Sequence, residues 1–161
     1  MTLCEDDETR CPVFRTMSPE ERQHVQQLAE YLTFQKGQTI FRERDEIMQG
    51  LWMLRRGTCD VVKELSGGAE QQMAFLEAGA IFGEMSFFDP APHSATVRAV
   101  AESELMFLAV EKIETLRLLD LSAAYKLITN AGQIMASKLR RMDRYTLDLF
   151  PAARTTRGPG I

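Results

Sequence analysis

The spacing of apolar residues divides this 161-residue chain into a helical segment, a long strand-like segment and a second helical segment. In the first segment, Ser18-Pro19-Glu20-Glu21 places serine at the N-cap, proline at the first helical position and glutamate at N3, which makes a capping box. Val25, Leu28 and Leu32 then recur at helical spacing. The pattern predicts an amphipathic helix that extends to about Tyr31.

Between Thr33 and Val110 the apolar period shortens to that of β-strands. Turn residues, among them Lys36-Gly37, Ser66-Gly67-Gly68 and Asp89-Pro90, separate short apolar runs. Many short strands with glycine turns favour an antiparallel barrel or jelly roll, because closed or doubled sheets protect their edges. The expected strands contain Phe34, Ile40-Phe41, residues 51–54, residues 59–62, residues 73–76, Thr96-Val97 and residues 105–108.

After Glu111 the helical period returns and predicts a short helix over about 111–119 and a long helix over about 122–148. Apolar positions along the long helix step alternately by four and three residues, although Gly132 and Thr146 interrupt the pattern. This spacing is typical of a coiled-coil seam. The seam contains Tyr125, Ile128, Met135, Leu139 and Met142.

A second apolar stripe on the long helix, formed by Ala124, Leu127, Ala131 and Ile134, lies beside this seam. A helix with two apolar faces needs two surfaces to cover them. We expect the β domain to cover one face and a second copy of the chain to cover the other, which predicts a homodimer. The alternative is a single wide core face on a monomer.

The composition indicates one soluble domain. With 45% hydrophobic residues the chain can bury a substantial core, and a formal net charge of −4 argues against nucleic-acid or anionic-membrane partners. The three cysteines imply no disulfide framework, and we find neither an apolar leader nor a membrane-spanning stretch, so we expect a cytoplasmic location. The expected parts are a flexible acidic lead (1–12), the domain with its C-terminal helix (13–149) and a disordered tail (150–161).

Residues 82–99, with the sequence FGEMSFFDPAPHSATVRA, carry the candidate chemistry. A Gly-Glu pair follows an apolar segment, a proline-containing stretch comes next, and small hydroxyl residues open the following strand. The carboxylate can accept hydrogen bonds from hydroxyl groups. Backbone N–H and side-chain OH groups of a tight turn can face a phosphate. The segment can therefore form a pocket for a small anion.

This segment resembles the phosphate-binding cassette of cyclic-nucleotide-binding domains, whose pattern begins F-G-E-x-[SA] and ends P-R-x-A-[ST]-V. Residues 34–41, 51–57 and 76–84 are similar to other signatures of the family, so the resemblance covers about residues 13–148. It implies a mostly β, double-stranded β-helix or jelly-roll fold with flanking helices. The long last helix is most similar to the dimerisation helix of bacterial Crp/Fnr regulators. We do not expect their DNA-binding helix-turn-helix here, and so expect no direct DNA binding.

The resemblance also implies roles for individual residues. Glu84 would accept a hydrogen bond from a ribose 2′-OH, and Gly83 would let the sugar approach the backbone; the alternatives are a surface carboxylate and a simple bend. Ser94, Ala95 and Thr96 would offer donors to a phosphate, or else would only open a strand. The expected ligand-binding residues are Gly83, Glu84, Met85, Ser86, His93, Ser94, Ala95 and Thr96.

His93 stands where the family has its phosphate-binding arginine. Histidine lacks the fixed fork of donors and the permanent charge of a guanidinium, and the loss of one charge-assisted hydrogen bond costs on the order of 10–150-fold in affinity. His93 is a weakened phosphate contact, a neutral replacement in a pocket that binds no nucleotide, or part of a site for another ligand. Arg98 either substitutes for the missing cation or pairs on the strand face.

Two other departures from the family pattern concern turns and base recognition. Arg44 replaces the usual glycine before Asp45. Met142-Asp143 falls where helix hydroxyls approach the base in cAMP-responsive members.

The residues Lys138, Arg140, Arg141 and Arg144 form a basic cluster, which we interpret as a solvated helix face. The histidines and cysteines lack metal-ligand spacing, so we expect no metal or other cofactor.

We therefore expect a non-enzymatic, stand-alone regulatory module, because the sequence contains no nucleophile–base pair and no P-loop. It would bind cAMP, cGMP or a related small anion and would signal through its dimer helix to an unidentified protein partner. The alternative is a dimeric scaffold that binds no nucleotide.

Overall fold

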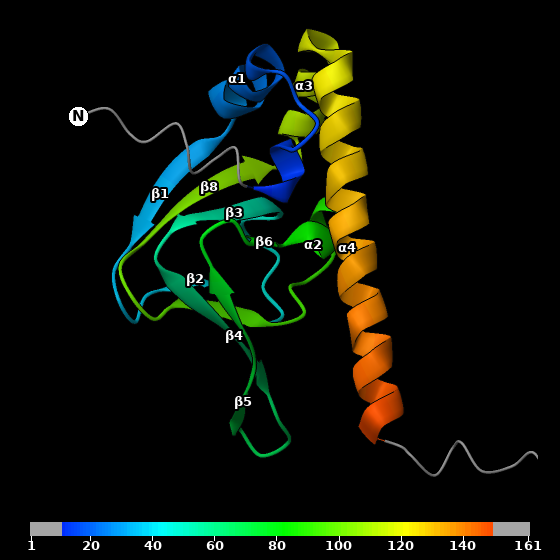
Figure 1. The fold of residues 1–161 in the computed structure, drawn as a ribbon. Helices are drawn as coiled ribbons and strands as arrows, with labels where there is room; N and C mark the ends of the chain where they lie inside the picture. Colours follow the sequence, from blue (N-terminus) through cyan, green and yellow to red (C-terminus); the bar gives the residue numbers. More distant parts are fainter. Residues whose placement is uncertain (1–10, 150–161) are drawn as a thin grey trace, which may run out of the picture.

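A computed structural model of the chain describes residues 11–149. Two antiparallel sheets enclose a core, and the long helix α4 runs along one side of them (Figure 1). The acidic lead expected over 1–12 and the tail expected over 150–161 lie outside the described residues, except for Cys11 and Pro12, and Cys11 is buried.

The described part contains four helices at its two ends, a short cassette helix and eight strands. Their bounds are η1 (Pro12–Phe14), α1 (Pro19–Leu28), β1 (Glu30–Phe34), β2 (Thr39–Phe41), β3 (Gly50–Arg56), β4 (Thr58–Glu64), β5 (Glu70–Glu77), β6 (Ile81–Phe82), α2 (Glu84–Phe88), β7 (Thr96–Ala99), β8 (Ser103–Ala109), α3 (Lys112–Leu119) and α4 (Leu121–Leu149).

The strands form two four-stranded sheets, with the orders β1-β8-β3-β6 and β2-β7-β4-β5. All strand pairs are antiparallel, and the inner faces of both sheets meet in one apolar cluster around the fully buried Trp52. Its ring lies 4.3 Å from that of Phe107 and 6.0 Å from that of Phe82, centroid to centroid. The predicted jelly-roll architecture is confirmed, and every predicted strand lies in an observed one.

Helix α1 begins as predicted and ends earlier. Glu21 N donates to Ser18 Oγ (3.2 Å) and Ser18 N donates to a Glu21 carboxylate oxygen (2.7 Å), so the capping box forms. The predicted end near Tyr31 is wrong, because Ala29 is extended and Tyr31 pairs with Met106 in the β1–β8 ladder. Strand pairing therefore overrides the helical spacing that continues to Leu32.

Helix α4 packs on the domain through small side chains. Ala123, Ala124, Leu127 and Ala131 are buried in the cluster that also holds η1 and part of β3. Asn130 Nδ2 donates to Val13 O and to Thr16 Oγ1, each at 2.8 Å, and so ties the helix to the N-terminal segment. The stripe predicted beside the seam is thus the face that the domain covers, while most seam residues are exposed.

Glu21 joins α1 to α4. Its carboxylate accepts hydrogen bonds from Lys126 Nζ (2.8 and 2.9 Å) and from Ser122 Oγ (2.6 Å). Lys126 above all, then Ser122 and the Ser18 N–H, lower the pKa of Glu21 from 4.5 to about 2. The charged carboxylate is therefore the form that the fold stabilises.

We expect this contact to make the fold sensitive to acid. Because the pKa of Glu21 is lower in the folded than in the unfolded chain, its contribution is complete above pH 4.5 and is lost as the pH falls toward 2. Glu21→Gln should lower the thermal midpoint at neutral pH and flatten its decline between pH 4.5 and 2, measured by circular dichroism. The matched control is Glu20→Gln at the exposed neighbouring position. An equal acid response in wild type and Glu21→Gln would contradict this assignment.

Candidate ligand-binding site

The cassette, defined here as residues 82–96, starts with a turn that only glycine fits. Gly83 has a φ of 74° and precedes α2. A Cβ at this position would lie 2.6 Å from Gly50 O and 2.8 Å from Trp52 Cδ1, both too close. The glycine therefore brings the backbone against β3. The helix α2 that begins at Glu84 lies beside α4 (Figure 1).

Glu84 is buried and already has a charged partner. Lys138 Nζ of α4 lies 2.6 Å from Glu84 Oε1 and also donates to Ile81 O at 2.5 Å. The side chain of Glu84 is 9% exposed, so the alternative reading from the sequence, a surface carboxylate, is wrong. The interpretation of Lys138 as part of a solvated basic face is wrong, because its ammonium turns back to the cassette. Sequence reasoning missed it, since no local pattern connects positions 84 and 138.

His93 is held inside the domain. Its ring stacks on Phe41, with centroids 3.9 Å apart and planes 14° apart. Nε2 lies 2.7 Å from Ile47 O, so Nε2 carries the proton and donates. Nδ1 then faces the Ser86 hydroxyl at 3.5 Å. Both ring nitrogens are directed to partners within the domain, which is the placement of a structural residue and not of a phosphate contact.

The remaining cassette donors differ in how many of their hydrogen-bonding positions are already used within the domain. Ser94 is exposed and its hydroxyl contacts only the Met85 sulfur (3.9 Å), so it can turn toward an anion. Thr96 Oγ1 accepts from Glu43 N at 2.9 Å and keeps its own proton for another acceptor. Ala95 is half-buried between them.

Arg98 does not supply the missing cation. Its guanidinium pairs with Asp60 (3.2 Å) and with Glu70 (2.8 Å) along the second sheet. Asp60, followed by Glu70, raises the pKa of Arg98 above its ordinary value. Pairing on the strand face, one of the two alternatives from the sequence, is confirmed.

The loop of residues 42–49, between β2 and β3, holds the far end of the cassette. Arg44 N donates to His93 O (2.8 Å) and His93 N donates to Asp45 O (2.9 Å). Gln49 Nε2 donates to Ala91 O at 2.9 Å. Together with the bond from His93 Nε2 to Ile47 O, these contacts fasten the loop to the cassette over its whole length.

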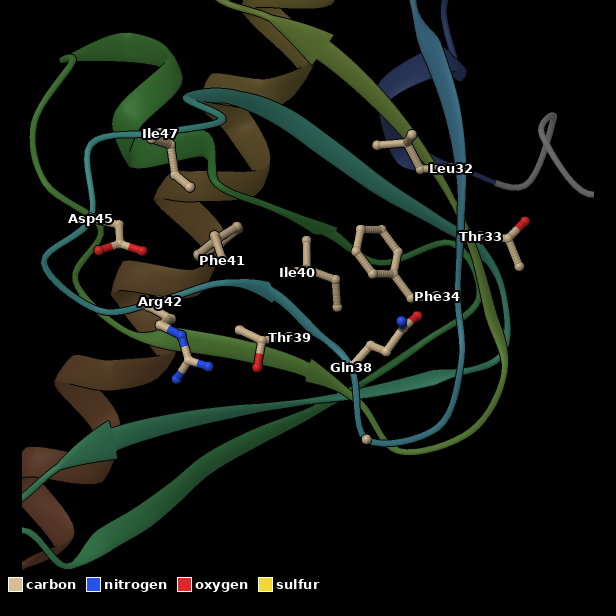
Figure 2. A pocket seen from close by; sticks show the side chains of 11 residues that line it. Leu32, Thr33, Phe34, Gln38, Thr39, Ile40, Phe41, Arg42, Asp45 and Ile47 are labelled. Atoms are coloured by element: carbon tan, nitrogen blue, oxygen red, sulfur yellow. The ribbon is translucent and has the colours of Figure 1, made fainter.

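Of two cavities in the described part of the chain, one is lined by cassette residues and the other is not. The first, of about 240 Å³, is lined by Met85, Ser86 and Ser94 and by Met135 of α4. It is smaller than the roughly 300 Å³ at which ligand pockets begin. The second, of about 630 Å³, lies between β1, β2 and the 42–49 loop, and contains no predicted site residue (Figure 2). The small cavity is the one that joins the cassette to α4.

Met135 was expected on the dimer seam, yet it is half-buried against the cassette. Gly132, one turn before it, faces Phe88: a Cβ there would lie 3.8 Å from Phe88 Cζ. The middle of the predicted seam therefore serves the contact between α4 and α2 within one chain.

Among residues 11–149, no group of three or more potential metal ligands occurs. Within the same range, none of the helices is both long and apolar enough to span a bilayer.

The fold and the cassette together define a β domain with an attached long helix. The family model for the cyclic nucleotide-binding domain matches residues 31–119. The cyclic AMP receptor protein of Thermus thermophilus is 31% identical over 140 residues, which is 86% of this chain. The chain belongs to the cyclic nucleotide-binding domain family.

Solved structures agree with this assignment. The Thermus thermophilus catabolite activator protein superposes with a TM-score of 0.74 and 30% identity over 87% of this chain. A cyclic nucleotide-binding domain from Methylobacillus flagellatus KT has the same fold, with a TM-score of 0.75 and 21% identity over 96% of this chain and 88% of its own. The chain spans only about three fifths of the two Thermus proteins, namely 62% and 63% of their lengths.

Arg44 provides a test of the loop geometry. It has a φ of 71° at the position where the sequence departs from the family glycine. A non-glycine residue in this region costs about 1 kcal/mol, so Arg44→Gly should stabilise the fold by about that amount and raise the thermal midpoint by roughly 2–4 °C.

The control is Arg42→Gly, an exposed arginine of the same loop whose φ is not positive and whose replacement should not stabilise. An Arg44→Gly protein that melts no higher than wild type, measured by calorimetry, would contradict the strain at this position.

Proposed function

We propose that the chain is a regulatory module that binds a cyclic nucleotide, or a related small anion, at the cassette and transmits binding to a partner through α4. The observation that carries this proposal is the contact between Glu84 and Lys138. It places the carboxylate expected to receive a ribose hydroxyl directly against the helix expected to transmit the signal. A displacement of the Glu84 side chain would therefore act on α4 directly, through Lys138.

The proposed ligand is cAMP or cGMP, bound weakly. Glu84 would accept from the ribose, and Ser94 and Thr96, with the backbone N–H groups around them, would face the phosphate. The position of the family's arginine is taken by His93, which is turned inward, and Arg98 is paired with Asp60 and Glu70. Neutral donors alone hold a phosphate less strongly than an arginine fork.

A titration of the purified protein with cAMP, with cGMP as the comparison, tests this function. We expect measurable binding, and we expect His93→Arg to tighten it by about 10-fold or more. Since the histidine ring fills the space between Phe41 and Ile47 O, we expect the longer guanidinium to turn to the phosphate side. His93→Gln, which retains a neutral donor, is the control and should not tighten binding. If neither nucleotide gives a heat of binding at millimolar concentration in this titration, the proposed sensor function is contradicted.

That negative result would favour the second candidate, a dimeric scaffold that binds no nucleotide. The observation in its favour is the internal bonding of His93, which resembles a structural residue more than a ligand contact. We propose neither candidate as an enzyme, because the first would hold its ligand without transforming it and the second would bind no nucleotide.

We propose that the partner at the helix seam is a second copy of the chain. Tyr125 and Leu139 are 69% and 60% exposed, and Ile128 and Met142 lie on the same face. Exposed apolar residues on one helix face favour protein–protein contact, and the four-three spacing favours a coiled helix pair.

Leu139→Glu should convert this dimer into a monomer, because it places a charge in the middle of the apolar seam. Light scattering coupled to size exclusion should then give the mass of one 18.3 kDa chain. The control is Leu118→Glu, at an exposed leucine on α3 outside the seam, which should leave the mass unchanged. A mass for Leu139→Glu equal to that of wild type would contradict the seam.

A further inference from the structure

Lys138 differs from the other cations at the end of α4. Arg140, Arg141 and Arg144 are exposed, whereas Lys138 is half-buried and its ammonium reaches the cassette. It bonds both the strand that leads into the cassette, at Ile81 O, and the cassette carboxylate, at Glu84 Oε1. Two of its three donor positions are therefore used to fasten α4 to the two residues on either side of the cassette turn.

We infer that this pair is a latch: Lys138 bonds the carboxylate that a ligand hydroxyl needs, so nucleotide binding competes with the lysine at Glu84. The inference rests on the proposed function and adds a regulation that it does not contain. A ligand hydroxyl and the lysine ammonium compete for the Glu84 carboxylate, and a ligand that displaces the lysine releases one contact that holds α4.

Charge and space support this exchange. A carboxylate bonded to an ammonium is held more strongly than one bonded to a neutral hydroxyl, so the lysine competes effectively. Met135, which is on the same helix as Lys138, lines the neighbouring cavity of about 240 Å³. A displacement of this part of α4 would free the carboxylate and enlarge the cavity together.

The latch also divides α4 into two parts. The N-terminal half is fixed by buried alanines and by the bonds of Asn130 and Lys126. Beyond Gly132, the polar contacts of α4 with the rest of the described chain include those of Lys138. Release of Lys138 therefore loosens the C-terminal half while the N-terminal half stays in place, which is a shift between two states of the same helix.

The experiment compares Lys138→Met with Lys126→Met in the full chain. Both lysines lie on α4, both pair with a glutamate at 2.6–2.8 Å, and both side chains are 32% exposed; only Lys138 contacts the cassette. We expect Lys138→Met to tighten cAMP or cGMP binding by about 10-fold or more, because one charge-assisted bond no longer competes. Lys126→Met should leave the affinity unchanged. Unchanged affinity in Lys138→Met overturns the latch, and weaker affinity overturns it in favour of Lys138 as a ligand contact.

A second measurement does not depend on nucleotide. Hydrogen exchange of backbone amides should rise at residues 81–88 and 135–142 in Lys138→Met and not in Lys126→Met. Equal exchange in the two variants overturns the latch. If wild type and Lys138→Met both fail to bind nucleotide, the proposed function falls, while the exchange result still decides whether Lys138 holds α4.

Removal of Lys138 leaves Glu84 as a buried charge, which destabilises the fold. Lys138→Gln keeps a neutral donor at this point and serves if Lys138→Met does not fold. Its affinity should lie between those of wild type and Lys138→Met, and an affinity at or below that of wild type overturns the latch.

Discussion

The close packing of α4 on the β domain is the constraint on which the other features depend. Its buried face is built mainly from alanines, so the helix axis comes near the domain surface and polar side chains can reach across. Asn130 reaches the N-terminal segment, Lys126 reaches α1, and Lys138 reaches the cassette. A larger residue at Ala123 or Ala131 would move the whole helix outward and break all three contacts together.

The cassette lies between two restraints of different kinds. At its start, Glu84 is held by a charge on α4; at its end, His93 is held by backbone groups of the 42–49 loop. The first restraint is a single ion pair that a competing donor can replace. The second consists of several neutral bonds and a ring stacked on Phe41, which no small ligand can substitute. We therefore expect the cassette to move more easily at Glu84, next to α4, than at His93, next to the 42–49 loop.

Local and periodic features could be predicted from the sequence, and contacts between distant residues could not. The capping box at Ser18, the strands and the buried alanine stripe follow from short-range pattern, and they agree with the structure. The end of α1 was wrong because pairing of Tyr31 with β8 is a tertiary effect. The inward turn of His93 and the Glu84–Lys138 pair depend on how three separate segments meet. A histidine or a lysine in the sequence carries no sign of which partner it will face.

Trp52 has a consequence for how this molecule can be observed. It is the only tryptophan of the chain. Its indole Nε1 donates to Met48 O near the end of the 42–49 loop, and its Cδ1 lies beside Gly83 at the start of the cassette. Its ring also stacks on Phe82. Tryptophan emission therefore comes from a single chromophore in contact with both sides of the cassette. The protein carries its own optical reporter of cassette position, with no label required.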